Sequence, residues 1–320
     1  MKHEKSEKSE KSEKSTKIDI MELLEKVYNT LKNTKGGKND TNIPALAKVD
    51  PSLYAISIYT VDGAIYNIGD YKTKFAVEST SKIFSLALAL DKYGEAYVKK
   101  KIGSKTSHLP FNSISEVENS RTHESNPFSN AGAIATTALS YETPVSKFEK
   151  KIVDNMSRFA GKKLYVNKSI YNSEMSLSAH NFALAYLMKY YSRLDEDVRD
   201  SVDVYTRQCS VMVTSADLAV MAATLACGGV NPETNVRVVK QRNVGYILDQ
   251  MDKNGLYDDD ESAKFHREMD VPAKSGVSGT LLLVIPGVMG IGIISPPLNK
   301  YGNSFKGMKT AKLLLRALQP

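Results

Sequence analysis

The segments that resemble strands lie at the two ends of this chain, and that separation constrains the fold more than any other feature. Near the amino end, residues 53–60 and 64–69 flank an Asp-Gly pair, a pattern typical of a β-hairpin. Near the carboxyl end, residues 271–276, 279–287 and 288–295 form three further strand-like segments. We therefore expect strands from both ends of the chain to form one antiparallel sheet.

The residues between these strands have the periodicity of helices. Apolar residues recur at helical spacing at 77–90, 130–141, 145–160, 178–191, 198–211, 215–226 and 238–255. Terminal helices are expected at 18–33 and 303–318, the latter capped at Asn303 or Ser304. The sequence thus predicts an α+β fold: an antiparallel sheet flanked by helices, from about 18–75 and 265–320, and a helical lobe from about 76–264.

The composition favours a globular protein and disfavours several other classes. The chain has 320 residues, 42% hydrophobic and 25% charged, and no apolar run long enough to span a membrane. The net charge is +7, partly from a Lys/Glu/Ser tail at 1–17 that we expect to be disordered. No basic stripe with interleaved aromatics is present, so nucleic-acid binding is not expected. The amino end lacks a hydrophobic signal segment, which predicts a cytoplasmic location.

One polar stretch precedes an apolar helix and suggests nucleophilic chemistry. Ser79 and Lys82 are three residues apart, so they share a face if the helix begins near Ser79. A serine needs a base to become a nucleophile, and a lysine becomes a base when burial lowers its pKa. The alternative is that Ser79 caps the helix while Lys82 extends to water.

A second motif strengthens the catalytic interpretation. Residues 274–276 read Lys-Ser-Gly on an expected strand, and serine acyl-transfer enzymes of the penicillin-recognising group combine Ser-x-x-Lys with Lys-Ser/Thr-Gly. The backbone N–H groups of Ser79 and Val277 are then candidates for an oxyanion hole. The alternative is that Lys-Ser-Gly forms a surface turn.

At this point the sequence resembles a known family, the serine-dependent glutaminases, which share the fold of serine β-lactamases and transpeptidases. The resemblance extends over about residues 20–319. It rests on "STSKIFSLALALD", "PFNSI", "NPFSNAGAI", "SEMSLSAHNFALAY", "CSVMVTSADLAVMAATLACGGVNP", "GLYD", "PAKSGVSG" and "ISPPLNKYGNSFKG". The resemblance implies hydrolysis of L-glutamine to L-glutamate and ammonia, with no metal or organic cofactor.

The resemblance also implies roles for individual residues. Ser79 corresponds to the nucleophile, Lys82 to its base, Tyr257 to the tyrosine that helps move the proton, and Val277 to the second oxyanion donor. Substrate-holding positions of the family correspond to Asn130, Glu174, Asn181 and Tyr205. Each also has a structural alternative: the tyrosines could simply pack, Asn130 could cap the following helix, and Glu174 and Asn181 could be solvated.

The sequence departs from the family pattern at one position near the expected site. Asn42 stands where the family usually has a tyrosine that closes over the substrate, and we expect weaker glutamine binding or a shifted loop. Two other functions stay open: a penicillin-recognising serine acylase, and a glutamine-binding protein with weak turnover. Because the family forms dimers or tetramers, the resemblance also implies a homodimer or homotetramer.

Overall fold

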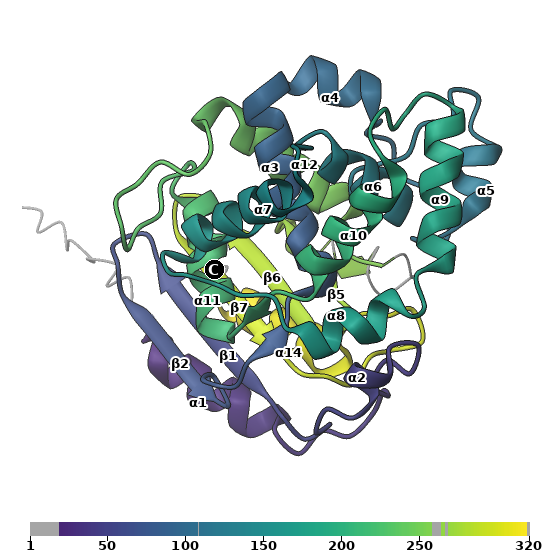
Figure 1. Cartoon of the computed structure of the whole chain (residues 1–320). Helices are drawn as coiled ribbons and strands as arrows, with labels where there is room; N and C mark the ends of the chain where they lie inside the picture. The colour runs from purple at the N-terminus through teal and green to yellow at the C-terminus, as the bar shows by residue number, and fades with distance from the viewer. Residues whose placement is uncertain (1–18, 108, 258–263, 266–267, 319–320) are drawn as a thin grey trace, which may run out of the picture.

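The computed structural model describes residues 19–107, 109–257, 264–265 and 268–318, and its largest sheet joins the two ends of the chain as expected (Figure 1). The strand order is β2-β1-β7-β6-β5, and every neighbouring pair is antiparallel. The strands are β1 (Ala55–Thr60), β2 (Ile65–Gly69), β5 (Ala273–Gly276), β6 (Thr280–Ile285) and β7 (Met289–Ile294). The predicted hairpin and all three carboxyl-terminal strands are therefore confirmed.

The alternation along β7 decides which helix covers which face of the sheet. Ile291 and Ile293 belong to the core that includes α1 (Ile20–Leu31) and α14 (Phe305–Leu318). Gly290 and Gly292 point the other way, and a Cβ on Gly292 would come within 2.2 Å of the Ser215 carbonyl oxygen in α11 (Ser215–Ala226). The two glycines thus let the backbone of α11 approach the sheet closely.

The middle of the chain forms helices that pack beside and against the sheet. They are α2 (Pro44–Ala47), α3 (Lys82–Tyr93), α4 (Glu95–Lys101), α5 (Ile114–Glu118), α6 (Asn130–Ala138), α7 (Val145–Ala160), α8 (Lys168–Met175), α9 (Ala179–Tyr190), α10 (Val198–Cys209) and α12 (Gln241–Asn254). The helix α11 falls within the predicted helical lobe but packs on β7 and β1. Its amino end is capped by Thr214, which forms a reciprocal capping box with Asp217.

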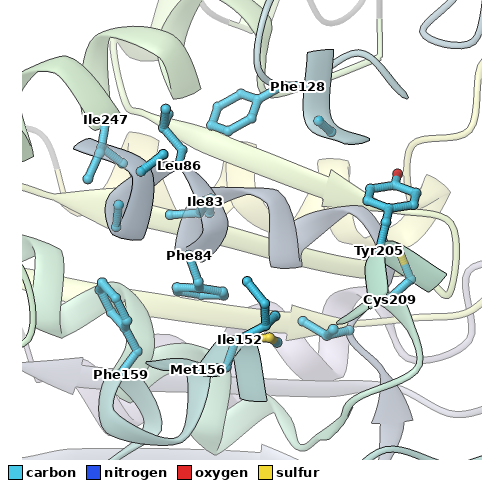
Figure 2. Close-up of a cluster of buried hydrophobic side chains, with 14 of the residues drawn as sticks. Ile83, Phe84, Leu86, Phe128, Ile152, Met156, Phe159, Tyr205, Cys209 and Ile247 are labelled. Atoms are coloured by element: carbon cyan, nitrogen blue, oxygen red, sulfur yellow. The ribbon is translucent and has the colours of Figure 1, made fainter. Parts of the chain in front are cut away.

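Helix α3 is central to the second core, which packs around its apolar residues (Figure 2). Phe84 contacts Phe159 of α7 with ring centroids 4.9 Å apart, and Ile83 and Leu86 are fully buried. The helices α4, α6, α7, α10 and α12 contact α3 or the short turn before it. The first residues of α3 are thereby fixed in a rigid, apolar setting.

A small second sheet ties the start of this region to the end of α10. β3 (Phe75–Ala76) pairs antiparallel with β4 (Met212–Val213), and the Val77 N–H donates to the Val211 carbonyl at 2.8 Å. This pairing, which the sequence patterns did not indicate, places residues 78–82 beside the carboxyl end of α10.

Two expectations concern the chain outside this architecture. The predicted disordered tail at 1–17 lies outside the described residues. Among the described residues, no helix is long and apolar enough to cross a membrane.

Candidate active site

Ser79 lies in a single 3₁₀ turn, Glu78–Ser81, that leads into α3. Its side chain is 7% exposed and lines a cavity of about 300 Å³. Positions three apart are eclipsed in a 3₁₀ turn, so Ser79 and Lys82 lie on one side. Within the described part of the chain, no hydrogen bond joins the Ser79 hydroxyl to the Lys82 amine, and the two groups stay separate in this state.

The Lys82 amine is fully buried and held by two acceptors. Its Nζ donates to the Phe128 carbonyl at 2.9 Å and to Asn130 Oδ1 at 2.8 Å. Burial lowers the pKa of Lys82 to about 8, against the opposing effects of Cys209, Glu116 and Glu78. At pH 7 a pKa of 8 leaves ~9% of the amine neutral, compared with ~0.03% at an ordinary lysine pKa. The alternative that Lys82 extends to water is therefore wrong.

Tyr257 follows α12 and lies beneath the cavity. Asn303 fixes its backbone on both sides, accepting from the Tyr257 N–H at 3.1 Å and donating to the Tyr257 carbonyl at 3.0 Å. The ring packs on Phe111 with centroids 4.7 Å apart. Burial raises the pKa of Tyr257, the Ser79 hydroxyl opposes that shift, and the tyrosine hydroxyl has no well-formed hydrogen bond among the described residues. The Tyr257 hydroxyl is therefore buried next to Ser79.

Val277 sits in the turn between β5 and β6, directly across from Ser79. The Ser278 hydroxyl donates to the Ala76 carbonyl at 2.6 Å, and the Thr280 hydroxyl donates to the Val77 carbonyl at 3.2 Å. These two bonds attach the turn to the residues that precede Ser79, and both Ser79 and Val277 line the cavity. Lys274 lies on β5, just before this turn, and is buried. Its amine donates to the Gly255 carbonyl at 3.0 Å, so Lys-Ser-Gly is not a surface turn.

Three polar side chains form a network on the helical side of the cavity. Asn130 Nδ2 donates to Asn181 Oδ1 at 3.2 Å, and the Tyr205 hydroxyl donates to Asn130 Oδ1 at 3.3 Å. The expectation that Asn130 caps α6 is wrong: the cap is Ser129, whose hydroxyl accepts from the Gly132 N–H. Because the cap is one residue earlier, the Asn130 amide is directed to Lys82 and the cavity.

Glu174 is near the end of α8, is half-buried and lines the cavity. Its carboxylate accepts from the Ser210 hydroxyl at 3.2 Å, and burial raises the pKa of Glu174 to about 7. Carboxylate oxygens of Glu174 and Glu78 and the Cys209 sulfur all lie within 4.8 Å of one another. Proximity of three such donors does not by itself make a metal site.

The chain matches the family model described as Glutaminase over residues 37–319. It belongs to the glutaminase family. Glutaminase 1 of Escherichia coli (strain K12) is 41% identical over 291 residues, covering 91% of this chain and 93% of that protein.

Solved glutaminase structures have the same fold. The structure of the probable glutaminase ybaS has a TM-score of 0.90 and 40% identity, covering 93% of this chain and 96% of that one. Mglu, solved in its glutamate form, has a TM-score of 0.88 and 32% identity, covering 95% of this chain and 69% of that one. The expected α+β fold of the serine β-lactamase type is therefore confirmed.

The residues singled out from the glutaminase resemblance lie in one region of the structure, but not all of them line the cavity. Six of them line the cavity: Ser79, Asn130, Glu174, Asn181, Tyr205 and Val277. Lys82 and Tyr257 are buried and do not line it. Asn42 lines the cavity, but its amide donates to Asp40 at 3.0 Å.

Sequence patterns missed several residues of this candidate site. Glu78, Asp40, Phe111 and Cys209 all line the cavity, and Asn303 fixes Tyr257 from outside it. Glu78 directly precedes the candidate nucleophile, and that position was the one available signal. The other four come from distant segments with no local pattern.

Proposed function

We propose that this chain hydrolyses L-glutamine to L-glutamate and ammonia through an ester formed on Ser79. The observation that carries the proposal is the combination of a nearly buried serine at the cavity floor with a lysine whose pKa is lowered to about 8 behind it. Membership of the glutaminase family supports glutamine as the substrate.

The first half of the reaction forms the ester and releases ammonia. Neutral Lys82 takes the Ser79 proton, through Tyr257 or directly, while Oγ attacks the side-chain amide carbon. The oxyanion is held by the backbone N–H groups of Ser79 and Val277. The C–N bond then breaks, the amide nitrogen takes the proton back from the lysine, and ammonia leaves. Asn130 orients Lys82 because it accepts from Nζ at 2.8 Å.

The second half of the reaction hydrolyses the ester. A water molecule gives a proton to Lys82 as it attacks the same carbon, and that proton returns to Ser79 Oγ when the ester bond breaks. The products are L-glutamate and the free enzyme, and no cofactor takes part in either half.

The polar lining suits the two charges of free glutamine. Glu174 pairs with the α-ammonium, and the Asn130, Asn181 and Tyr205 side chains supply neutral donors for the α-carboxylate. A positively charged donor near Lys82 would lower the pKa of Lys82 further, and these neutral donors avoid that effect.

The test is glutamine-dependent ammonia release by the purified protein and by Ser79→Ala. Release by the wild type that falls at least ~10³-fold in the variant supports the proposal. Equal release by both proteins refutes it. Wild-type protein that binds glutamine without releasing ammonia would instead identify a binding protein, and covalent labelling of Ser79 by a penicillin would identify an acylase of the penicillin-recognising group.

A homodimer or homotetramer and a cytoplasmic location belong to the same proposal. Light scattering coupled to gel filtration measures the oligomeric state directly. Fractionation of cells that express the full chain measures its location.

A further inference from the structure

Glu78 is a buried carboxyl group in an unusual backbone conformation. Its φ is +49°, which non-glycine residues rarely adopt, and its residue exposure is 3%. Gly276 packs against it, and a Cβ on that glycine would lie 3.3 Å from the Glu78 Cβ. One carboxylate oxygen, Oε1, is buried and has no hydrogen-bond partner among the described residues. The side chain nevertheless lines the cavity, so the fold holds an unsatisfied acid against the substrate space.

The groups around Glu78 come from every neighbouring element. Glu174 of α8 and Asp40 of the loop before α2 are acidic, and Cys209 and Tyr205 of α10 and Tyr257 after α12 ionise only to negative forms. Lys82 of α3 is the basic group whose charge acts on it, and His180 of α9 lines the same cavity, where its ring nitrogen Nε2 contacts the Asn112 carbonyl. Burial, followed by the charge and hydrogen bond of Glu174, raises the pKa of Glu78 well above its ordinary value, while Lys82 opposes the shift.

We propose that Glu78 and Glu174 share one proton in the free enzyme and together receive the α-ammonium of the substrate, which expels that proton. This inference rests on the proposed function, because it takes the α-ammonium of glutamine as the cation. Two carboxyls whose oxygens lie within 4.8 Å of each other cannot both ionise at low cost unless a cation faces them. The substrate ammonium is such a cation, and it converts the pair from one negative charge to two while the proton passes to solvent.

The pair makes glutamine affinity depend on pH in a defined direction. Below the titration of the pair, binding must release a proton, so affinity rises as pH rises, by up to ~10-fold per pH unit. Above that titration the pair is already doubly ionised, and affinity levels off. A single Glu174 beside a group at position 78 that cannot titrate would also release a proton below its pKa of about 7. Its proton release would end at lower pH than that of the pair, in which the pKa of Glu78 is raised well above its ordinary value by burial and by Glu174.

The experiment uses the Ser79→Ala protein, which holds glutamine without turning it over. Calorimetric titration with L-glutamine from pH 6 to pH 8.5, in two buffers of different ionisation enthalpy, counts the protons released. We expect about one proton per glutamine and a dissociation constant that falls ~5–10-fold between pH 6 and pH 7. The matched variant adds Glu78→Gln, which keeps the size of the side chain and cannot titrate. Its proton release then comes from Glu174 alone, and we expect it to be smaller and to end at lower pH than in Ser79→Ala.

The outcomes separate this inference from the proposed function. Glutamine binding to Ser79→Ala without proton release overturns the shared proton even when the Glu78 variant fails to fold. The same pH dependence in both proteins overturns it as well. Wild-type protein that releases no ammonia refutes the proposed function, and that assay does not involve Glu78.

Discussion

The pH dependence of turnover should move when the charge beside Lys82 is changed, and Asn130→Asp makes that change at a known distance. Asn130 Oδ1 accepts from Lys82 Nζ at 2.8 Å, so the variant places a carboxylate in contact with the amine. An opposite charge at such a distance shifts a pKa by ~1–3 units in favour of the charged form. The pKa of Lys82 should therefore rise from about 8 to ~9–11.

The consequence is a smaller neutral fraction of Lys82 at a given pH. At pH 7.5 that fraction falls from ~24% to between ~3% and ~0.03%, so kcat should fall between ~8-fold and ~800-fold. The informative quantity is the pH at which kcat reaches half of its plateau, because it is insensitive to lost substrate contacts. It should shift upward by the same ~1–3 units.

The assay is ammonia release at saturating glutamine from pH 6 to pH 10. The control is Asn181→Asp, which adds the same charge to the same cavity but contacts Asn130 rather than Lys82. We expect a clearly smaller shift there. An unchanged half-plateau pH in Asn130→Asp, or an equal shift in both variants, would refute the assignment of Lys82 as the base.

Three further predictions test other parts of the molecule. Lys82→Met should abolish turnover yet raise the free energy of unfolding at pH 7 by about 1–2 kcal/mol, as measured by urea titration. The reason is that removing a buried amine of low pKa stabilises the fold by more than leaving the Phe128 carbonyl unpaired destabilises it. A lower free energy of unfolding in the variant would contradict this prediction. Gly292→Ala should cost about 1–3 kcal/mol since the added Cβ meets the backbone of α11, whereas Gly245→Ala has nothing within 4 Å and should stabilise by ~0.5–1 kcal/mol. Asn42→Tyr should lower the Michaelis constant for glutamine by restoring a ring at the cavity wall; no decrease in steady-state kinetics means that Asn42 is not the limiting contact.

The parts of the fold that sequence predicted are those with a local signal. The Asp62-Gly63 pair between two alternating segments specified the hairpin, and helical spacing specified α11 at 215–226. The packing of α11 against the sheet was not predicted from the sequence. Its residues are apolar on all sides, which is typical of a helix buried between two layers. The α6 cap was assigned one residue late because Ser129 and Asn130 are both good capping residues.

Residue spacing alone predicted the site only where a motif existed, and the family resemblance supplied Asn130, Glu174, Asn181, Tyr205 and Tyr257. Ser79, Lys82 and the Lys-Ser-Gly strand have residue spacings that by themselves indicate acyl-transfer chemistry. Glu78 has no such spacing, and an acid next to a helix start is usually exposed. It is buried because β3 pairs with β4, and that pairing joins residues far apart in the chain.

The acidic pair and the lysine also act on each other, and this links substrate recognition to base strength. Ionisation of Glu78 raises the pKa of Lys82, which would weaken the lysine as a neutral base at pH 7. A shared proton keeps that charge low in the free enzyme, and the α-ammonium of a bound substrate cancels it once the proton has left. The site thus holds two opposed requirements, an acidic receptor for a cation and an uncharged amine, within one cavity. Only a ligand that carries its own positive charge to the acidic side satisfies both at once.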